Sequence, residues 1–149
     1  MKIYCFFLFI LLNTFSSFAQ TINKESILIF SVNFHTTTFI SIPCENFSIQ
    51  FEKQIKINKV YAEDSISILD KFLRNIKVLK NGKKVNVDTR AKLIYKNKMG
   101  KEVIICTDGF NLLINGSIVK RNKQFLKFIL SLIPKEQLFI HHPPSHLLS

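Results

Sequence analysis

The chain has 149 residues, of which 47% are hydrophobic and 15 are phenylalanine, so it is long enough for one folded domain and too apolar for a disordered chain. Lysine and arginine outnumber aspartate and glutamate by 21 to 10, which gives a formal net charge of +11. Such an excess favours anionic partners, namely nucleic acid, lipid headgroups or acidic polysaccharide, and a solvated lysine-rich surface explains it as simply.

The first 19 residues have the pattern of a cleavable secretory signal. Lys2 precedes the apolar run Ile3–Leu12, and the polar end that follows places the small residues Ser17 and Ala19 where a signal peptidase requires them. This end resembles bacterial secretory signals. We therefore expect cleavage between Ala19 and Gln20 and export to the periplasm or out of the cell. The apolar run is too short to span a bilayer, so an uncleaved anchor is the weaker alternative.

The sequence predicts that the chain consists of three segments. Residues 1–19 are the signal, residues 20–134 a single domain, and residues 135–149 a partly disordered tail. Pro143 and Pro144 exclude regular structure in the tail, whereas its apolar start, Leu138–Ile140, can dock on the domain.

Strands are predicted before the first helix. In Ser26–His35 the side chains alternate as in a half-buried strand. The inward set is expected to be Phe30, Val32 and Phe34, with Ser31, Asn33 and His35 facing solvent. Strand-forming residues continue through Thr37–Ile42 up to Pro43, and Gln54–Tyr61 alternates weakly.

The spacing of apolar residues then changes to that of a helix. From Ser65 to Leu79 they recur every three or four positions, and Asp64 is placed to cap the first turn. Asn81-Gly82 follows and is typical of a left-handed helix end. We therefore expect a helix over about residues 65–79.

A series of short strands and a second helix follow. The strands are expected at Lys84–Asp88, Arg90–Asn97, Lys101–Thr107, Phe110–Ile114 and Ser117–Val119, with turns at Gly100, Gly109 and Gly116. The run Val103–Cys106 is apolar on both faces, which places it centrally in the sheet. The second helix is expected over about 123–133, capped by Asn122 and ended before Pro134.

This order of elements predicts the fold class. Strands, a helix, more strands and a second helix favour an α+β fold. We expect an antiparallel sheet of about five to seven strands, with both helices packed on one of its faces.

The two cysteines of the predicted domain, Cys44 and Cys106, are candidates for a disulfide because export leads to an oxidising compartment. Two separate buried thiols are the alternative. A third possibility is that one of them serves as a nucleophile with His35, but no motif around either residue supports it. No phosphate-binding loop occurs. The tail histidines His141, His142 and His146 can bind a transition metal, but the proline-containing tail does not hold them as a fixed site. We therefore expect no cofactor, no metal site and no enzymatic activity.

Basic residues cluster between residues 77 and 101. Arg90, Lys92 and Lys96 have the same parity along a predicted strand, opposite to the apolar set of that strand. They lie near the expected helix end that carries Lys77 and Lys80. These five residues form a candidate anion-binding site, although an ordinary solvated sheet face has the same pattern. No aromatic residues interleave with them, so nucleic acid is not expected as a partner.

The sequence thus predicts a small, exported, basic binding or protein-interaction module, of inhibitor or immunity type, with an envelope or extracellular protein as its partner. The alternative is an envelope-surface binder of anionic lipid or polysaccharide. The two hypotheses differ in salt response, because a purely ionic contact weakens more steeply with salt.

Overall fold

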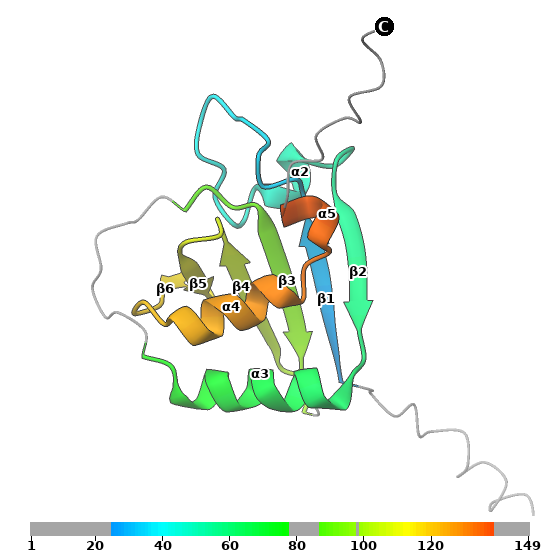
Figure 1. The fold of residues 1–149 in the computed structure, drawn as a ribbon, viewed down its shortest axis with the longest axis vertical. Coiled ribbons are helices and arrows are strands. Elements are labelled where there is room, and N and C mark those ends of the chain that lie inside the picture. The colour runs from blue at the N-terminus through cyan, green and yellow to red at the C-terminus, as the bar shows by residue number, and fades with distance from the viewer. Residues whose placement is uncertain (1–24, 78–86, 98, 139–149) are drawn as a thin grey trace, which may run out of the picture.

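The computed structural model describes residues 25–77, 87–97 and 99–138, which form one antiparallel sheet with its two longer helices on one face (Figure 1). The strands lie in the order β2-β1-β3-β4-β5-β6. Their bounds are Ser26–Ser31 (β1), Lys56–Val60 (β2), Ala91–Lys96 (β3), Glu102–Thr107 (β4), Leu112–Ile114 (β5) and Ser117–Ile118 (β6). The predicted α+β class is confirmed, and β4 with its run Val103–Cys106 is an inner strand as expected.

Helices α3 (Glu63–Asn75) and α4 (Lys123–Ser131) pack on the same face of the sheet. Ile66 of α3 and Phe125 of α4 belong to one core cluster with inward residues of four strands. The strand residues of this cluster are Ile27, Ile29, Ala91, Leu93, Tyr95, Ile105, Leu112 and Ile114. Removal of these side chains from water is the main stabilising term of the fold. Within the described parts of the chain, no helix has the length and apolar character needed to cross a membrane.

The connection from β1 to β2 lies over one end of the opposite face and builds a second, smaller core. This connection contains the short helix α2 (Phe47–Gln50). Its buried residues are Val32, Ile42, Phe47 and Phe51, with Phe30 and Ile55 packed against them. Apart from this end, the opposite face is covered by none of the described helices.

Strand β1 differs from its prediction in length and in the side that it buries. Ile27, Ile29 and Ser31 are its buried residues, so the expectation that Ser31 faces solvent is wrong. Phe30 points to the other face, into the second core. The alternation rule fails here because β1 is apolar on both sides, and both sides are at least partly covered. The predicted strand over Thr37–Ile42 is also wrong, since these residues form a loop.

Only some of the helix ends lie where the predicted capping residues would place them. Asn122 caps α4 as predicted, and its side-chain oxygen accepts the N–H of Phe125 at 3.0 Å. Helix α3 begins at Glu63, two residues earlier than an Asp64 cap would place it, with Ala62 at the N-cap position, and it ends at Asn75 instead of residue 79. The side chain of Asn75 donates to the carbonyl of Lys71 at 2.8 Å, and Ile76 is extended and packs on the core. Thus α3 stops where tertiary packing draws Ile76 inward.

Several predictions concern residues outside the described part of the chain. They are the cleavage site at Ala19–Gln20, the Asn81-Gly82 helix end and most of the predicted strand Lys84–Asp88. Residues 135–138, the start of the predicted tail, form the short helix α5 (Lys135–Leu138). The carbonyl of Gln137 accepts the N–H of Phe34 at 2.8 Å, and Leu138 packs against the main core.

The turns between strands use the residues that the sequence marked. Asn115 and Gly116 have φ values of 48° and 77°, the left-handed pair of a two-residue hairpin turn. Gly109 has a φ of 92°, and a Cβ at this position would lie 3.2 Å from the ring of Phe34. Gly109 therefore serves both the turn and the close approach of Phe34.

Candidate interaction surface

Arg90 does not belong to the exposed basic group that the sequence predicted. It lies one residue before β3 and is only 6% exposed. Its guanidinium binds both carboxylate oxygens of Asp88 and donates to the hydroxyl of Thr38 at 3.1 Å. It also lies 5.6 Å from the centre of the Phe51 ring. With these donors and this charge satisfied inside the protein, Arg90 holds segments together and is not available to an anion.

Lys92 and Lys96 are on the face of β3 that the alternation predicted. Ala91, Leu93 and Tyr95 are buried on the other side, while Lys92 is half-buried and Lys96 is exposed. The structure thus brings Lys92 and Lys96 onto the sheet face opposite α3 and α4.

Lys77 lies in a different place. It follows α3 on the helix-covered side of the molecule, where its carbonyl accepts the N–H of Lys120 at 3.0 Å. Its side chain is exposed. The structure therefore does not bring Lys77 together with Lys92 and Lys96, and Lys80 lies outside the described residues.

The strand register defines the surface on which Lys92 and Lys96 lie, here called the open face. One row across the strands is Lys59, Leu28, Ile94 and Ile104, and the next row is Ile57, Phe30, Lys92, Cys106, Leu113 and Ile118. Phe30 and Cys106 are covered by the β1–β2 connection. The open face consists of the remaining apolar residues, Leu28, Ile57, Ile94, Ile104, Leu113 and Ile118, with the lysines Lys59, Lys92 and Lys96.

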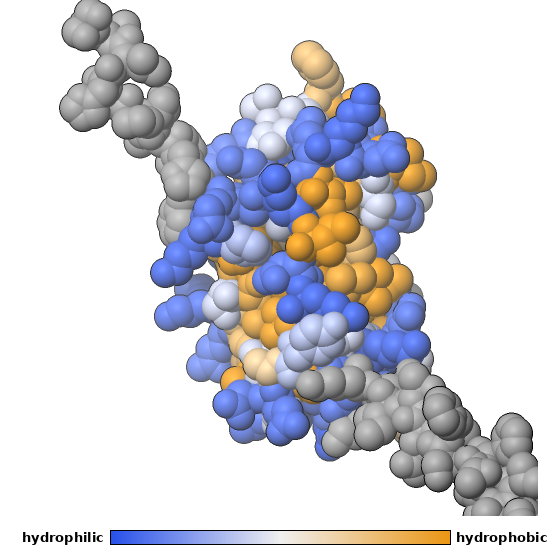
Figure 2. Space-filling view, turned by 90° about the vertical axis from the view of Figure 1, so that its right-hand side faces the viewer, coloured by the Kyte–Doolittle hydropathy of each residue, from blue (hydrophilic) through white to orange (hydrophobic). Residues whose placement is uncertain are grey.

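The apolar side chains of the open face belong to neither core cluster. Ile57 is 65% exposed, and the others are partly exposed. Figure 2 views the molecule along the sheet from its β2 edge and shows apolar side chains among hydrophilic ones at this edge. The open face is therefore an apolar strip with lysines beside it, and one acid, Glu102, is the register partner of Lys96 at its margin.

Sequence reasoning missed Lys59 because β2 alternates weakly. Register pairs Lys59 with Leu28, and its ammonium lies 5.0 Å from the ring centre of Tyr61. The lysine and the aromatic ring are two residues apart on one side of the strand, a spacing visible in the sequence. The sequence does not show which strand lies beside β2, so the pairing of Lys59 with Leu28 could be found only from the sheet order.

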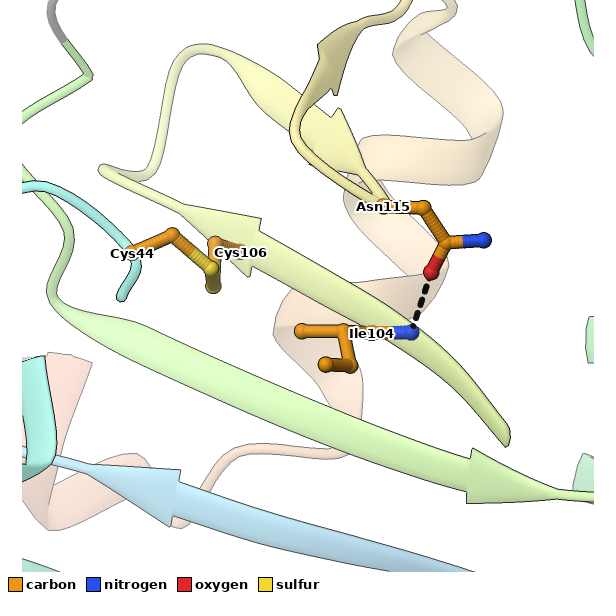
Figure 3. The surroundings of a disulfide bond; sticks show 4 residues. All are labelled: Cys44, Ile104, Cys106 and Asn115. Carbon is orange, nitrogen blue, oxygen red and sulfur yellow. Dashed lines mark hydrogen bonds between the residues drawn. A yellow bond between two sulfur atoms is a disulfide. The ribbon is translucent and has the colours of Figure 1, made fainter.

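Cys44 and Cys106 are joined by a disulfide, which borders the open face (Figure 3). The Cα atoms are 5.9 Å apart, and the bond links the β1–β2 connection to β4. On the same strand, the N–H of Ile104 donates to the side chain of Asn115 at 2.9 Å. The bond therefore fixes the connection to a strand that the neighbouring hairpin also holds.

Little in the described residues is arranged for catalysis or metal binding. Both cysteines of the described part are bonded to each other, so neither offers a thiolate to pair with His35, whose side chain is exposed. Within the same residues, no three histidine, cysteine or acidic side chains are grouped as metal ligands.

Comparison of the chain with protein-family models, curated proteins and solved structures finds no match. What the open face can bind therefore follows from its own side chains. An apolar strip bordered by cations is complementary to a surface that presents apolar groups and carboxylates.

Proposed function

We propose that this chain is a small exported module that binds an acidic protein through the open face of its sheet. The observation that carries the proposal is the strip of six apolar side chains that neither core takes up, with Lys59, Lys92 and Lys96 beside it. Contiguous exposed apolar surface on a small domain is the usual mark of an interaction site.

Charge complementarity indicates the kind of partner. The chain has a formal net charge of +11, and of the three open-face lysines only Lys96 has an acid, Glu102, as a register partner, while Lys59 and Lys92 pair with apolar residues or Cys106. Acidic residues on a partner would meet these lysines at the rim, while the apolar strip would supply the dehydrated centre of the contact. Acidic polysaccharide offers the charges without a comparable apolar complement, and a lipid bilayer offers its apolar groups only below the headgroups, so a protein surface fits a flat sheet face better.

A binding role, in preference to catalysis, is supported by the use of both described cysteines in a disulfide. The inhibitor-type role belongs to the same proposal, since a basic module that covers an acidic enzyme cleft would need only complementary charge and shape.

The test compares two triple charge reversals in the tagged chain, purified from the cells that produce it. The open-face variant is Lys59→Glu/Lys92→Glu/Lys96→Glu. The matched control, Lys71→Glu/Lys123→Glu/Lys127→Glu, changes three exposed lysines of α3 and α4. Each protein is incubated with envelope extract and washed at low and then near-physiological salt.

We expect one discrete protein to be retained at the higher salt by the native chain and by the control, and to be lost from the open-face variant. Purified, that protein should bind the native chain with an affinity at least tenfold higher than the open-face variant, because three rim charges are reversed. Equal retention by the open-face variant would refute the proposal. Retention of lipid or polysaccharide alone, lost with salt, would replace the protein with an anionic surface.

A further inference from the structure

A loop at the end of the sheet exposes two large apolar side chains. In the loop between Phe34 and Cys44, Phe39 is 110% exposed relative to a free residue and Ile40 is 71% exposed. This loop projects beyond the strands at the top of Figure 1, and Figure 2 shows an apolar projection at the same end. Neither side chain belongs to either core cluster, so the fold gains nothing from their apolar character.

The chain just before these two residues is fixed by Arg90. The hydroxyl of Thr38 accepts a hydrogen bond from the guanidinium at 3.1 Å, and the same guanidinium is held by Asp88 and by the carbonyl of Thr89. Arg90 is buried and Thr38 is half-buried, so this contact is partly shielded from water and from salt.

The chain just after them is fixed by Ile42. Its side chain is 2% exposed and belongs to the second core. Its N–H donates to the carboxylate of Asp88 at 2.9 Å, and its carbonyl accepts the N–H of Thr89 at 2.8 Å. Two residues further on, Cys44 is bonded to β4.

The segment Phe39–Ser41 is therefore short and exposed, and it lies between two residues that the same Asp88–Arg90 segment holds. A backbone fixed in this way has little conformational entropy left to lose on binding. Rigid display of apolar anchors is how binding loops reach high affinity, because an aromatic side chain then fills a pocket at low ordering cost.

We propose that residues 38–42 form a preorganised binding loop, which inserts Phe39 and Ile40 into an apolar pocket of a partner protein. The occupant is a protein and not a membrane, because residues 36–50 contain no lysine or arginine and include one acid, Glu45. Apolar segments that enter anionic bilayers depend on basic residues beside them. This site uses residues other than the open face, so it stands whether or not the open face binds.

The test places the photo-crosslinking residue p-benzoylphenylalanine at position 39 of the tagged full chain in the cells that produce it. The matched control places it at Phe110, an apolar residue that is 76% exposed on a different loop. We expect position 39 to form one discrete protein adduct that position 110 does not form. Adducts with lipid only, with a second copy of this chain only, equal adducts at both positions, or no adduct would each overturn the proposal.

The purified adduct partner is then titrated with variants of the chain. Phe39→Ser should weaken binding about 30-fold, as for a hot-spot residue, and Phe110→Ser should leave it unchanged. Thr38→Val, which removes the acceptor for Arg90, should weaken binding about fivefold, whereas Thr37→Val should not, because Thr37 has no such bond. Unchanged affinity for both Phe39→Ser and Thr38→Val would refute the loop.

The same titration separates this inference from the open-face proposal. Loss of binding in the Lys59→Glu/Lys92→Glu/Lys96→Glu variant, with full binding in Phe39→Ser, would support the open face and refute the loop. The reverse pattern would support the loop and refute the open face for this partner.

Discussion

At the scale of single residues, Arg90 shows how parity along a strand can mislead. Arg90, Lys92 and Lys96 have the same parity, but only the two lysines lie within β3. Arg90 directly precedes the strand, at the end of the sheet face that the β1–β2 connection covers, where Thr38 and Phe51 contact it and Asp88 forms an ion pair with it. Burial of a guanidinium requires such a partner, and the sequence contained the carboxylate two residues away.

Burial of Tyr95 makes the stability of the fold depend on pH. Its hydroxyl donates to Glu25 at 3.2 Å, and its side chain is 2% exposed. Burial, with smaller effects from Glu25 and Asp70, raises the pKa of Tyr95 from 10.0 to about 12. A raised pKa means that the folded state keeps the proton that the unfolded chain loses between these two values.

We therefore expect Tyr95 to contribute to the free energy of unfolding. This contribution is fully present below pH 10 and is lost as the pH rises towards 12. Its size is roughly 2–3 kcal/mol, at about 1.4 kcal/mol for each pKa unit. Urea unfolding of native chain and Tyr95→Phe at pH 8, 10 and 12 measures it. The free energy of unfolding should fall more steeply with pH in the native chain than in Tyr95→Phe. Parallel pH profiles for the native chain and Tyr95→Phe would contradict the prediction.

At the scale of elements, the disulfide ties the β1–β2 connection to the sheet. The bond joins residues that are 62 positions apart in the sequence. In the chain-entropy model, the loss of conformational entropy in the unfolded chain then raises the free energy of unfolding by about 4 kcal/mol. The second core that the connection builds has four buried residues. A core of this size is small, and the connection depends on the covalent link to remain in place.

We expect Cys44→Ser/Cys106→Ser to lower the free energy of unfolding by about 4 kcal/mol and to increase amide exchange first in the β1–β2 connection. Urea titration measures the stability, and hydrogen exchange read by mass spectrometry locates the change. Exchange in β3 and in α4, which belong to the main core, should change least and serves as the internal control. Equal stability with and without the bond would show that the second core holds the connection alone.

At the scale of the whole molecule, the two proposed contacts have different chemistry. The open face combines apolar side chains with lysines, while the loop around Phe39 and Ile40 has no basic residue within residues 36–50. The loop is part of the β1–β2 connection, and another part of the same connection, held by the disulfide, borders the open face. Salt should therefore weaken binding through the open face more than binding through the loop.

Export is a prediction for the whole chain. Removal of residues 1–19 would leave a protein that begins at Gln20 and has a formal net charge of +10, because Lys2 is lost from the +11 of the full chain. The intact mass and the N-terminal peptide of the protein from producing cells measure this. We expect a start at Gln20, and Ala19→Lys should block the cleavage. A mature protein that retains Met1 or Lys2 would show that the segment is not a cleaved signal.

The fold class and most element positions followed from the sequence. Period and turn chemistry are local properties: Asn122 caps α4, Asn115-Gly116 closes a hairpin, and the apolar run of β4 demands an inner strand. Each of these needs only residues within a few positions of one another, so the sequence by itself determined them.

Tertiary structure decided what local patterns cannot specify. The two-sided burial of β1, the early end of α3 and the burial of Arg90 depend on which segments lie over which face. The same holds for the pairing of Lys59 with Leu28 and for the Arg90–Thr38 contact, which spans 52 residues. These features arise from contacts between segments distant in the sequence, and the candidate binding surfaces are made of such contacts, so the fold had to be known before they could be found.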